Sequence, residues 1–299
     1  MDIGRIVDFF YSKFFWRVCV LLPILIGVGI YLRMQYVEYF MPSEQLPYYK
    51  IKPRAEEDTV RVIIVGDSWA EFHANLEGDT IFEIESKKMT DIPMRSWTRG
   101  KGGSLSKQIY YFMYDSLTVE NPFEQDRCTQ PLIESHPDYC ALYAGINDVI
   151  FKRSYYYYTE NLKHMIRMLL HHGIRPIVMQ IPMVDAASAI DYKPFLKRSP
   201  YHIRAFILGT EYNTIPDYRE AQMKMLKETG LIDSVLFIPA AKWDTIGGWD
   251  DRIYTYDRVH LNMRGYHVLD SCLASEVLKD WKKRQKISAR QKANGPGKD

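Results

Sequence analysis

The stretch VRVIIVGDSWAEF, residues 60–72, places a serine directly after a run of apolar residues. This run, residues 60–66, has the near-continuous apolar character of a strand that is buried on both faces of a parallel sheet. Strands that alternate with helices predict an α/β fold, in which ligands bind at the carboxyl ends of the strands. Ser68 therefore lies where such a fold places its active site. Further strands are predicted at residues 92–98, 139–145, 175–182 and 234–240.

A serine becomes a strong nucleophile only when a base lies within hydrogen-bonding distance and a third group orients that base. The flanks of Ser68 do not form the G-x-S-x-G turn of the α/β-hydrolases. After the last predicted strand, the segment YDRVHLNMRGYH carries Asp257 and His260 three positions apart. That spacing can bring the carboxylate beside the imidazole. We therefore predict that Ser68 is the nucleophile, His260 the base and Asp257 the orienting group.

Two further strand ends offer donors for the negative charge that develops when an ester carbonyl is attacked. The segment RGKGGSLS, residues 99–106, follows the second predicted strand, and its glycines let backbone N–H groups approach a ligand closely. The segment AGINDV, residues 144–149, follows the third predicted strand, and its Asn147 offers a side-chain amide. Each segment alone is typical of a turn. Their joint position at strand ends indicates an active site.

Together, the four segments resemble the sequence blocks of the SGNH, or GDSL-type, hydrolases. The resemblance spans about residues 60–281 and implies a three-layer α/β/α sandwich with a five-stranded, mainly parallel sheet of the flavodoxin-like type. The second block departs from the usual pattern of the family at Thr98 and Ser104. The matching stretches are Gly66-Asp67-Ser68, TRGKGGS with Gly103 as the oxyanion glycine, Gly145-Ile146-Asn147-Asp148, and Asp257-Arg258-Val259-His260.

The resemblance also implies a mechanism. Ser68 would attack an ester carbonyl, with His260 acting first as base and then as acid and with Asp257 orienting the imidazole. The oxyanion would lie among the Ser68 and Gly103 N–H groups and the Asn147 amide. Neither a metal nor an organic cofactor is implied.

The N-terminal segment VCVLLPILIGVGIYL, residues 18–32, is uncharged and lies between Arg17 and Arg33. It is shorter than the roughly 20 residues that usually span a bilayer, but flanking arginines can reach the interface. No small-x-small cleavage site follows, so we expect an uncleaved single-pass anchor, with a cleaved signal peptide as the alternative. More Lys and Arg residues precede the segment than closely follow it, which predicts a cytoplasmic N-terminus and an extracytoplasmic catalytic domain, periplasmic in a Gram-negative cell.

The C-terminal segment, residues 282–299, holds seven Lys or Arg residues and one Asp, and we expect it to be disordered. Since the whole chain has a formal net charge of +2 and this tail carries +6, the rest carries about −4. A body that is not basic argues against nucleic-acid binding.

The predicted organisation has five parts. They are residues 1–17 (cytoplasmic), 18–33 (anchor), 34–58 (linker), 59–281 (hydrolase domain) and 282–299 (tail).

Aromatic residues near the predicted site suggest the substrate class. Trp69 follows the nucleophile, and Tyr155 and Tyr156 follow the third block, so these rings could stack on sugars, or they could pack the next helix. With an outward-facing anchored domain, we expect an esterase that removes an O-acetyl or other short acyl group from a cell-envelope or extracellular glycan.

Two other functions remain open. One is an O-acyltransferase that uses the same triad beside a membrane-bound O-acyltransferase partner. The other is a non-catalytic binding or assembly subunit of the envelope. The chain also leaves open whether Cys128 and Cys140 form a disulfide or stay separate thiols.

Overall fold

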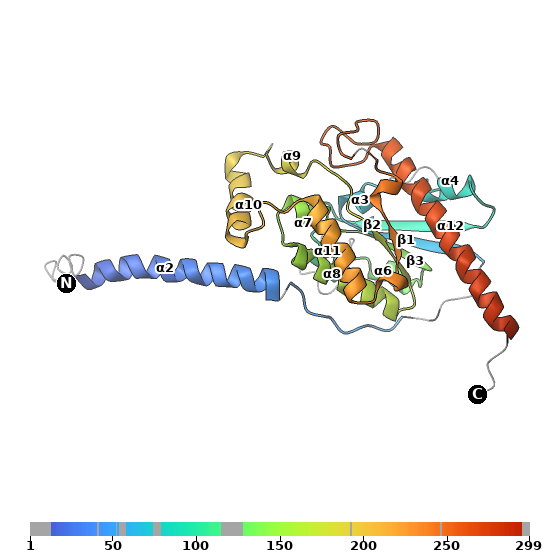
Figure 1. Cartoon of the computed structure of the whole chain (residues 1–299), viewed down its shortest axis with the longest axis horizontal. Coiled ribbons are helices and arrows are strands. Elements are labelled where there is room, and N and C mark those ends of the chain that lie inside the picture. Colours follow the sequence, from blue (N-terminus) through green and yellow to red (C-terminus); the bar gives the residue numbers. More distant parts are fainter. Residues whose placement is uncertain are drawn as a thin grey trace.

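A sheet of five parallel strands forms the centre of the body (Figure 1). Its order is β2-β1-β3-β4-β5, so successive strands are added on one side of β1 and then on the other, and the switch point between β1 and β3 is where doubly wound sheets open a binding crevice. The predicted fold class, a three-layer α/β/α sandwich of flavodoxin-like topology, is confirmed. The strands are β1 (Val60–Gly66), β2 (Met94–Gly100), β3 (Tyr139–Tyr143), β4 (Arg175–Met179) and β5 (Leu236–Ile238).

The structure, a computed structural model, describes residues 13–40, 42–51, 53, 58–73, 79–114, 128–191, 193–245 and 247–294. Short 3-10 turns flank β5, at Ile232–Ser234 and Ala240–Lys242. The helices are α2 (Lys13–Gln35), continued by a π-helical turn η1 (Tyr36–Phe40), α3 (Ser68–Glu71), α4 (Ile81–Lys87), α5 (Ser106–Phe112), α6 (Gln130–Glu134), α7 (Ile146–Ile150), α8 (Tyr155–His171), α9 (Ala186–Asp191), α10 (Phe195–Leu208), α11 (Ile215–Glu228) and α12 (Met263–Asn294).

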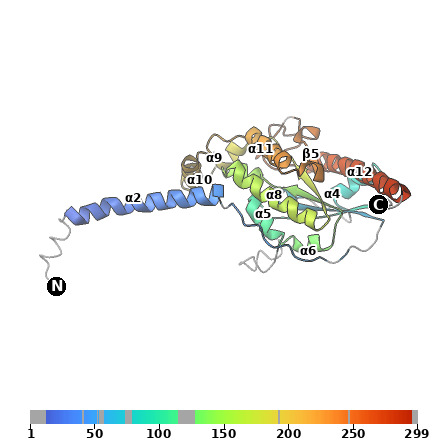
Figure 2. The ribbon, with the colours of Figure 1, turned by 60° about the horizontal axis from the view of Figure 1, so that its bottom comes forward.

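Helices cover both faces of the sheet (Figure 2). Parallel strands are joined by right-handed crossovers, so the helices that follow β1 lie on one face and those that follow β2, β3 and β4 lie on the other. The packing follows this rule, because α4 packs against α12 while α8 packs against α5 and α11. The buried apolar side chains of β1, β3 and β4 form the core between these layers.

Cys128 and Cys140 are separate buried thiols in the structure. Cys140 lies within β3 as part of the core, and Cys128 lies ahead of α6, where its Sγ donates to the Phe112 carbonyl at 3.2 Å. Both behave as small apolar side chains that complete the packing beside the sheet.

The N-terminal helix leaves the body as one long rod (Figure 1). The apolar helical segment covers Phe15–Phe40, longer than the predicted anchor at residues 18–33, and the expectation that a linker begins at residue 34 is wrong for residues 34–40. No Gly or Pro lies between Tyr31 and Phe40 to end the helix, and the body holds the last turn in place. By length and composition this helix could cross a membrane, although a signal sequence has the same properties.

The C-terminal tail also differs from the prediction. Helix α12 continues through residue 282 to Asn294, so the expected disorder is wrong for that part of the tail. Residues 282–293 contain neither Gly nor Pro and are rich in the helix formers Lys, Arg, Gln and Ala. Their positive charge suits the C-terminal end of a helix, and the Arg284 guanidinium lies 5.7 Å from the centre of the Tyr139 ring. Residues 295–299 lie outside the described residues.

Candidate active site

The nucleophile predicted from the sequence lies at the carboxyl edge of the sheet. Ser68 is the first residue of α3, and the preceding Asp67 caps that helix by accepting a hydrogen bond from the Trp69 N–H at 3.0 Å. A side chain at Gly66 would meet the Tyr143 carbonyl oxygen at 2.1 Å, so only glycine allows β1 and β3 to approach at this level. The end of β1 therefore presents the Ser68 hydroxyl beyond the sheet.

A loop ahead of α12 brings the base to the serine. The His260 Nε2 lies 2.8 Å from the Ser68 Oγ, and the His260 Nδ1 lies 2.6 Å from the Asp257 Oδ2. The loop is closed on itself, since the Thr255 N–H donates to the His260 carbonyl at 2.8 Å. The structure thus joins the three predicted residues in one chain of hydrogen bonds, in the order that a serine nucleophile requires.

The Asp257 carboxylate is held in its charged form. Burial by itself would raise its pKa, but hydrogen bonds from the backbone and ring of His260, from the Thr255 hydroxyl and from the Val259 N–H lower the pKa to about 2. The Oδ1 atom accepts from the Thr255 hydroxyl at 2.7 Å and from the Val259 and His260 N–H groups at 2.9 Å each, which leaves Oδ2 for the ring. An ionised Asp257 can then stabilise the imidazolium that forms when His260 takes a proton.

The predicted oxyanion donors line the same cleft as the Ser68 hydroxyl. Gly103 and Asn147 line one cleft together with Ser68 and His260. Gly103 has a φ of 76°, which favours glycine, and its N–H donates to no acceptor among the described residues. The neighbouring Gly102 N–H donates to the Glu71 carboxylate at 2.6 Å. Of these two N–H groups, the one at Gly103 is therefore free to bind an oxyanion.

The Asn147 amide is oriented by two acceptors. Its Nδ2 donates to the Ser104 carbonyl at 3.1 Å and to the Asp67 Oδ2 at 3.3 Å. The contact to Asp67 is long for an N–H donor, whereas the contact to Ser104 has an ordinary length. The Ser104 carbonyl therefore orients the amide, and the weaker contact to Asp67 is the one that the amide can exchange for an oxyanion at smaller cost.

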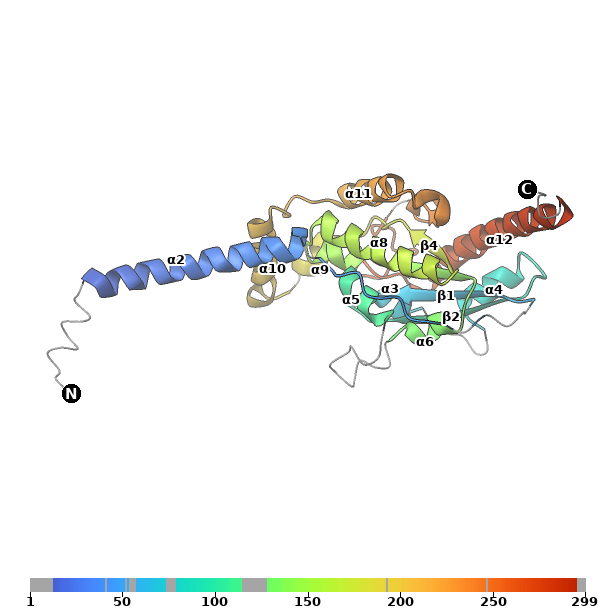
Figure 3. The same ribbon diagram turned by 90° about the horizontal axis from the view of Figure 1, so that it is seen from below.

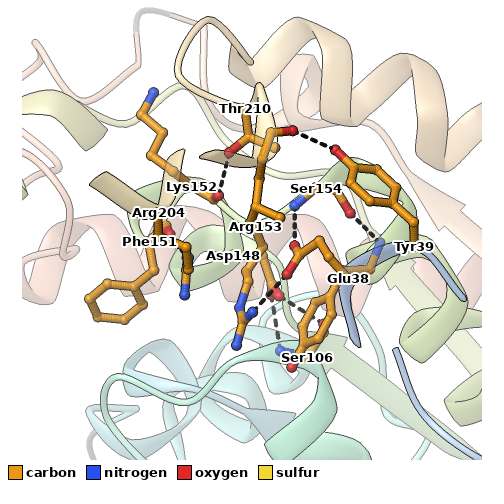
Figure 4. Close-up of polar contacts among 12 residues, drawn as sticks. Glu38, Tyr39, Ser106, Asp148, Phe151, Lys152, Arg153, Ser154, Arg204 and Thr210 are labelled. Atoms are coloured by element: carbon orange, nitrogen blue, oxygen red, sulfur yellow. Dashed lines mark hydrogen bonds and ion pairs between the residues drawn. The ribbon is translucent and has the colours of Figure 1, made fainter. Parts of the chain in front are cut away.

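Two buried carboxyl groups, those of Asp67 and Asp148, lie close to these donors. Asp148, on α7 beside Asn147, accepts from the Ser106 N–H at 3.0 Å and from the Ser106 hydroxyl at 2.9 Å (Figure 4). Burial raises the pKa of Asp67 to about 7 and that of Asp148 to about 6, although hydrogen bonds from Trp69 and from Ser106, respectively, oppose the shift. Asp148 thereby connects α7 to the start of α5, the helix that follows the glycine loop.

The cleft over the triad has a volume of about 740 Å³. Several residues that line it were missed in the sequence. Phe72 lies one helical turn after Ser68, and its ring centre is 5.3 Å from that of His260; the i, i+4 spacing could have found it. Tyr256 and Arg258 also line the cleft, and they flank Asp257 in the sequence. No local pattern in the sequence points to five further lining residues, which are Ile150, Phe151, Ser188, Ala189 and Lys193.

The three aromatic residues predicted to bind substrate do not line the cleft, and the prediction is wrong for the buried Trp69. Trp69 is only 2% exposed, and its ring packs against Trp243 behind the site. Tyr155 and Tyr156 are exposed in the first turn of α8, outside the cleft. The cause is that Ser154 caps α8 through the N–H of its third residue, and this orientation turns the first two rings of the helix to solvent.

No family model matches the chain, and no curated protein matches it. Several solved structures are similar at low identity. A GDSL-like lipase from Bacteroides thetaiotaomicron is 15% identical with a TM-score of 0.45, over 74% of this chain and 88% of that chain. A putative acylhydrolase from Bacteroides fragilis is 17% identical with a TM-score of 0.48, over 76% and 91%. The acetylxylan esterase Axe2 from Geobacillus stearothermophilus is 14% identical with a TM-score of 0.44, over 73% and 94%.

Proposed function

We propose that this chain is a serine esterase of the SGNH type that removes an O-acetyl or other short acyl group from a glycan at the cell envelope. The observation that carries the proposal is the hydrogen-bonded series Ser68–His260–Asp257 at the mouth of a cleft. A buried structural serine has no need of a histidine that is oriented by a charged carboxylate. The predicted order of motifs and the parallel sheet support the same activity.

The proposed reaction is acyl transfer to water, and the positions of the triad residues support each of its steps. The Ser68 Oγ attacks the ester carbonyl while its proton passes to the His260 Nε2, and the carbonyl oxygen becomes an oxyanion near the Gly103 N–H and the Asn147 amide. When the tetrahedral intermediate collapses, His260 returns the proton to the departing sugar oxygen, and the acyl group stays on Ser68. His260 then deprotonates a water molecule that attacks the acyl-enzyme, and the carboxylic acid leaves as the serine is restored.

A membrane anchor is part of the proposal. We propose that α2 holds the chain in a bilayer with its N-terminus in the cytoplasm, which would place the cleft on the outer side, where envelope glycans lie. The apolar residues on α2 are exposed along its length, as a helix that faces lipid requires.

The first test is covalent labelling of the full-length chain by a fluorophosphonate, together with turnover of a short aryl ester. We expect wild-type protein to be labelled and active, and Ser68→Ala to be neither. Ser188→Ala is the matched control, because Ser188 lines the same cleft but bonds only to Asp185 among the described residues. Absence of both labelling and turnover in the wild type would refute the esterase. If the wild type is labelled and active, mass spectrometry of envelope glycans from cells with and without Ser68→Ala would identify the acyl group.

An acyltransferase remains the second candidate, with a membrane-bound O-acyltransferase as its acyl supplier. Its acceptor would need a surface that excludes water from the acyl-enzyme. Tyr256 at the rim and Phe72 beside His260 are the aromatic residues that could form one. Partition of an acyl donor in the presence of oligosaccharide distinguishes the two functions: excess free acid supports the esterase, and excess acylated oligosaccharide supports the transferase. A binding subunit without catalysis would show neither product.

A further inference from the structure

Helix α10 exposes an apolar face that packs against no other part of the described chain. Leu196, Ile203 and Phe206 are 83%, 59% and 75% exposed. Their spacing places them along one side of a helix, whereas Ala205 and Leu208 are buried against the body. Isolated exposed apolar residues are ordinary, but several large apolar side chains on one side of an amphipathic helix mark an interaction surface. We call these three residues the α10 face.

The charges on α10 itself are positive. Residues 192–210 contain four Lys or Arg side chains and no Asp or Glu, although Asp191 and Glu211 flank this stretch and Asp191 lies 4.0 Å from Arg198. Lys197 is exposed one residue after Leu196, and Lys193 precedes the helix. An amphipathic helix with an apolar face and basic neighbours is the composition that lies in the interface of an anionic bilayer.

The position of α10 in the fold also agrees with docking on a bilayer. Figures 1 and 3 show α10 at the end of the body from which α2 leaves, and Figure 1 shows it running across the direction of α2. The Gln35 Nε2 donates to the Ile207 carbonyl at 3.1 Å, and the Tyr39 hydroxyl donates to the Leu208 carbonyl at 3.0 Å. If α2 crosses a bilayer, α10 therefore lies along the bilayer surface.

The depth of α10, relative to the uncharged stretch of α2, also agrees with a position in the bilayer interface. The uncharged stretch of α2 ends at Leu32, and Arg33 is the next charged residue. Arg33, Met34 and Val37 line one small cavity together with Arg204 and Leu208 of α10. The end of α10 thus lies level with the point where α2 leaves the hydrocarbon region, which is the depth at which interfacial helices bind.

A buried ion pair fixes this arrangement. Glu38, in the turn that continues α2, is 1% exposed and lies 2.7 Å from the Arg153 guanidinium (Figure 4). The other oxygen of Glu38 accepts from the Ser154 N–H, at the start of α8. Because both oxygens of a buried carboxylate are bound by the body, the direction of α2 relative to α10 is set by the fold and does not depend on a flexible linker.

From these observations we infer that the α10 face docks into the interface of the same bilayer that α2 crosses. The inference rests on the membrane anchoring contained in the proposed function. It has a consequence for the site, because Ser188, Ala189 and Lys193, next to α10 in the chain, line the cleft of Ser68. Docking holds the cleft beside the membrane surface, so the substrate class is an ester carried at that surface, such as a lipid-linked or membrane-associated glycan.

The direct test is photo-crosslinking of the full-length chain in vesicles of phosphatidylcholine and phosphatidylglycerol. Benzoylphenylalanine placed at Phe206 should crosslink to lipid acyl chains, detected by mass spectrometry. The matched control is the same probe at Trp97, an aromatic residue on β2 that is 43% exposed and lies away from α10. Lipid adducts at Phe206 well above those at Trp97 support docking. Crosslinks to a second copy of the chain, or no adducts, overturn it, as does release of the wild type from membranes by alkaline extraction.

A functional test is independent of the probe. The double variant Leu196→Asp/Phe206→Asp should reduce turnover of a vesicle-embedded ester at least about tenfold, because the apolar burial of two side chains is lost. It should hydrolyse a soluble aryl ester like the wild type. Equal turnover of the embedded ester by variant and wild type, or an equal loss on both substrates, overturns the inference. Failure of the esterase proposal would be distinct, since the wild type would then hydrolyse neither ester while the crosslinks could still form.

Discussion

The edge of the sheet that carries Ser68 and the junction that carries Glu38 are built in different ways. At the sheet edge, Asp257 and His260 are three residues apart, and short loops with local backbone hydrogen bonds hold them. At the junction, Glu38 meets Arg153 across 115 residues of sequence. The Asp257–His260 pair is thus ordered within one loop, whereas its contact with Ser68, 192 residues away, and the position of the body on α2 both depend on long-range pairing. Substitutions at the edge should therefore change turnover, and those at the junction should change stability and placement.

The largest expected effect is at the orienting carboxylate. Asp257→Asn keeps the shape of the side chain but removes the charge and changes which His260 tautomer is favoured. Turnover should fall by about 10⁴, while the melting temperature in detergent should fall only modestly, because the lowered pKa of this partly exposed carboxylate contributes some stability at neutral pH. Aryl ester kinetics and thermal unfolding of the same samples check both parts. A large loss of stability would mean that the loop, like the junction, depends on this charge, and the comparison would fail.

The next effect is at the oxyanion donor. Asn147→Ala should lower kcat by about 10²–10³ with little change in KM, because the amide is expected to bind the oxyanion and not the ground-state ester. Steady-state kinetics with the aryl ester measure the two constants separately. If KM rises while kcat is unchanged, Asn147 positions the substrate instead, and if neither moves, Asn147 has no part in the site.

At the junction, Glu38→Ala should destabilise the full-length chain by roughly 3 kcal/mol, since it leaves the mostly buried Arg153 without its carboxylate. Aryl ester turnover at a temperature where the variant is folded should stay close to wild type. The double variant Glu38→Ala/Arg153→Met is the control, because removing both charges should recover most of the loss. Equal instability of the single and double variants would show that the pair contributes only through packing.

The smallest expected effect is the pH dependence of stability that Asp148 causes. Burial raises the pKa of Asp148 from 3.8 to about 6, so the folded chain keeps a proton that the unfolded chain has lost between these values. This carboxyl therefore stabilises the fold most fully below about pH 4, and the stabilisation is lost as the pH rises through 6. Asp148→Asn does not titrate, and its amide can still bond both groups of Ser106.

Relative to the wild type, Asp148→Asn should accordingly gain stability as the pH rises from 4 to 7, by at most about 3 kcal/mol. Thermal unfolding of both proteins across that range measures the difference, and Asp148→Ala, which cannot bond Ser106, controls for the lost contacts. A difference that is constant with pH would show that Asp148 is ionised in the folded state throughout.

Much of the site could be predicted because its parts are local. A buried apolar strand that ends in Gly66-Asp67-Ser68 places the serine at the carboxyl edge of a parallel sheet, wherever the other strands lie. The three-residue spacing of Asp257 and His260 likewise brings carboxylate and ring together within one short loop. In both cases the backbone path between the functional groups is too short to allow many alternatives.

Other properties depended on segments that are distant in sequence. Trp69 looked available for substrate, but Trp243 and Tyr254 pack against its ring from the other end of the chain. Residues 34–40 were expected in a linker, but Glu38 is buried by Arg153. The exposure of an aromatic ring or the burial of a carboxylate is decided by which surfaces meet. Spacing in the sequence was enough to pair Asp257 with His260, whereas the contact of His260 with Ser68, and which side chains face the cleft or the core, arise only when distant segments pack together.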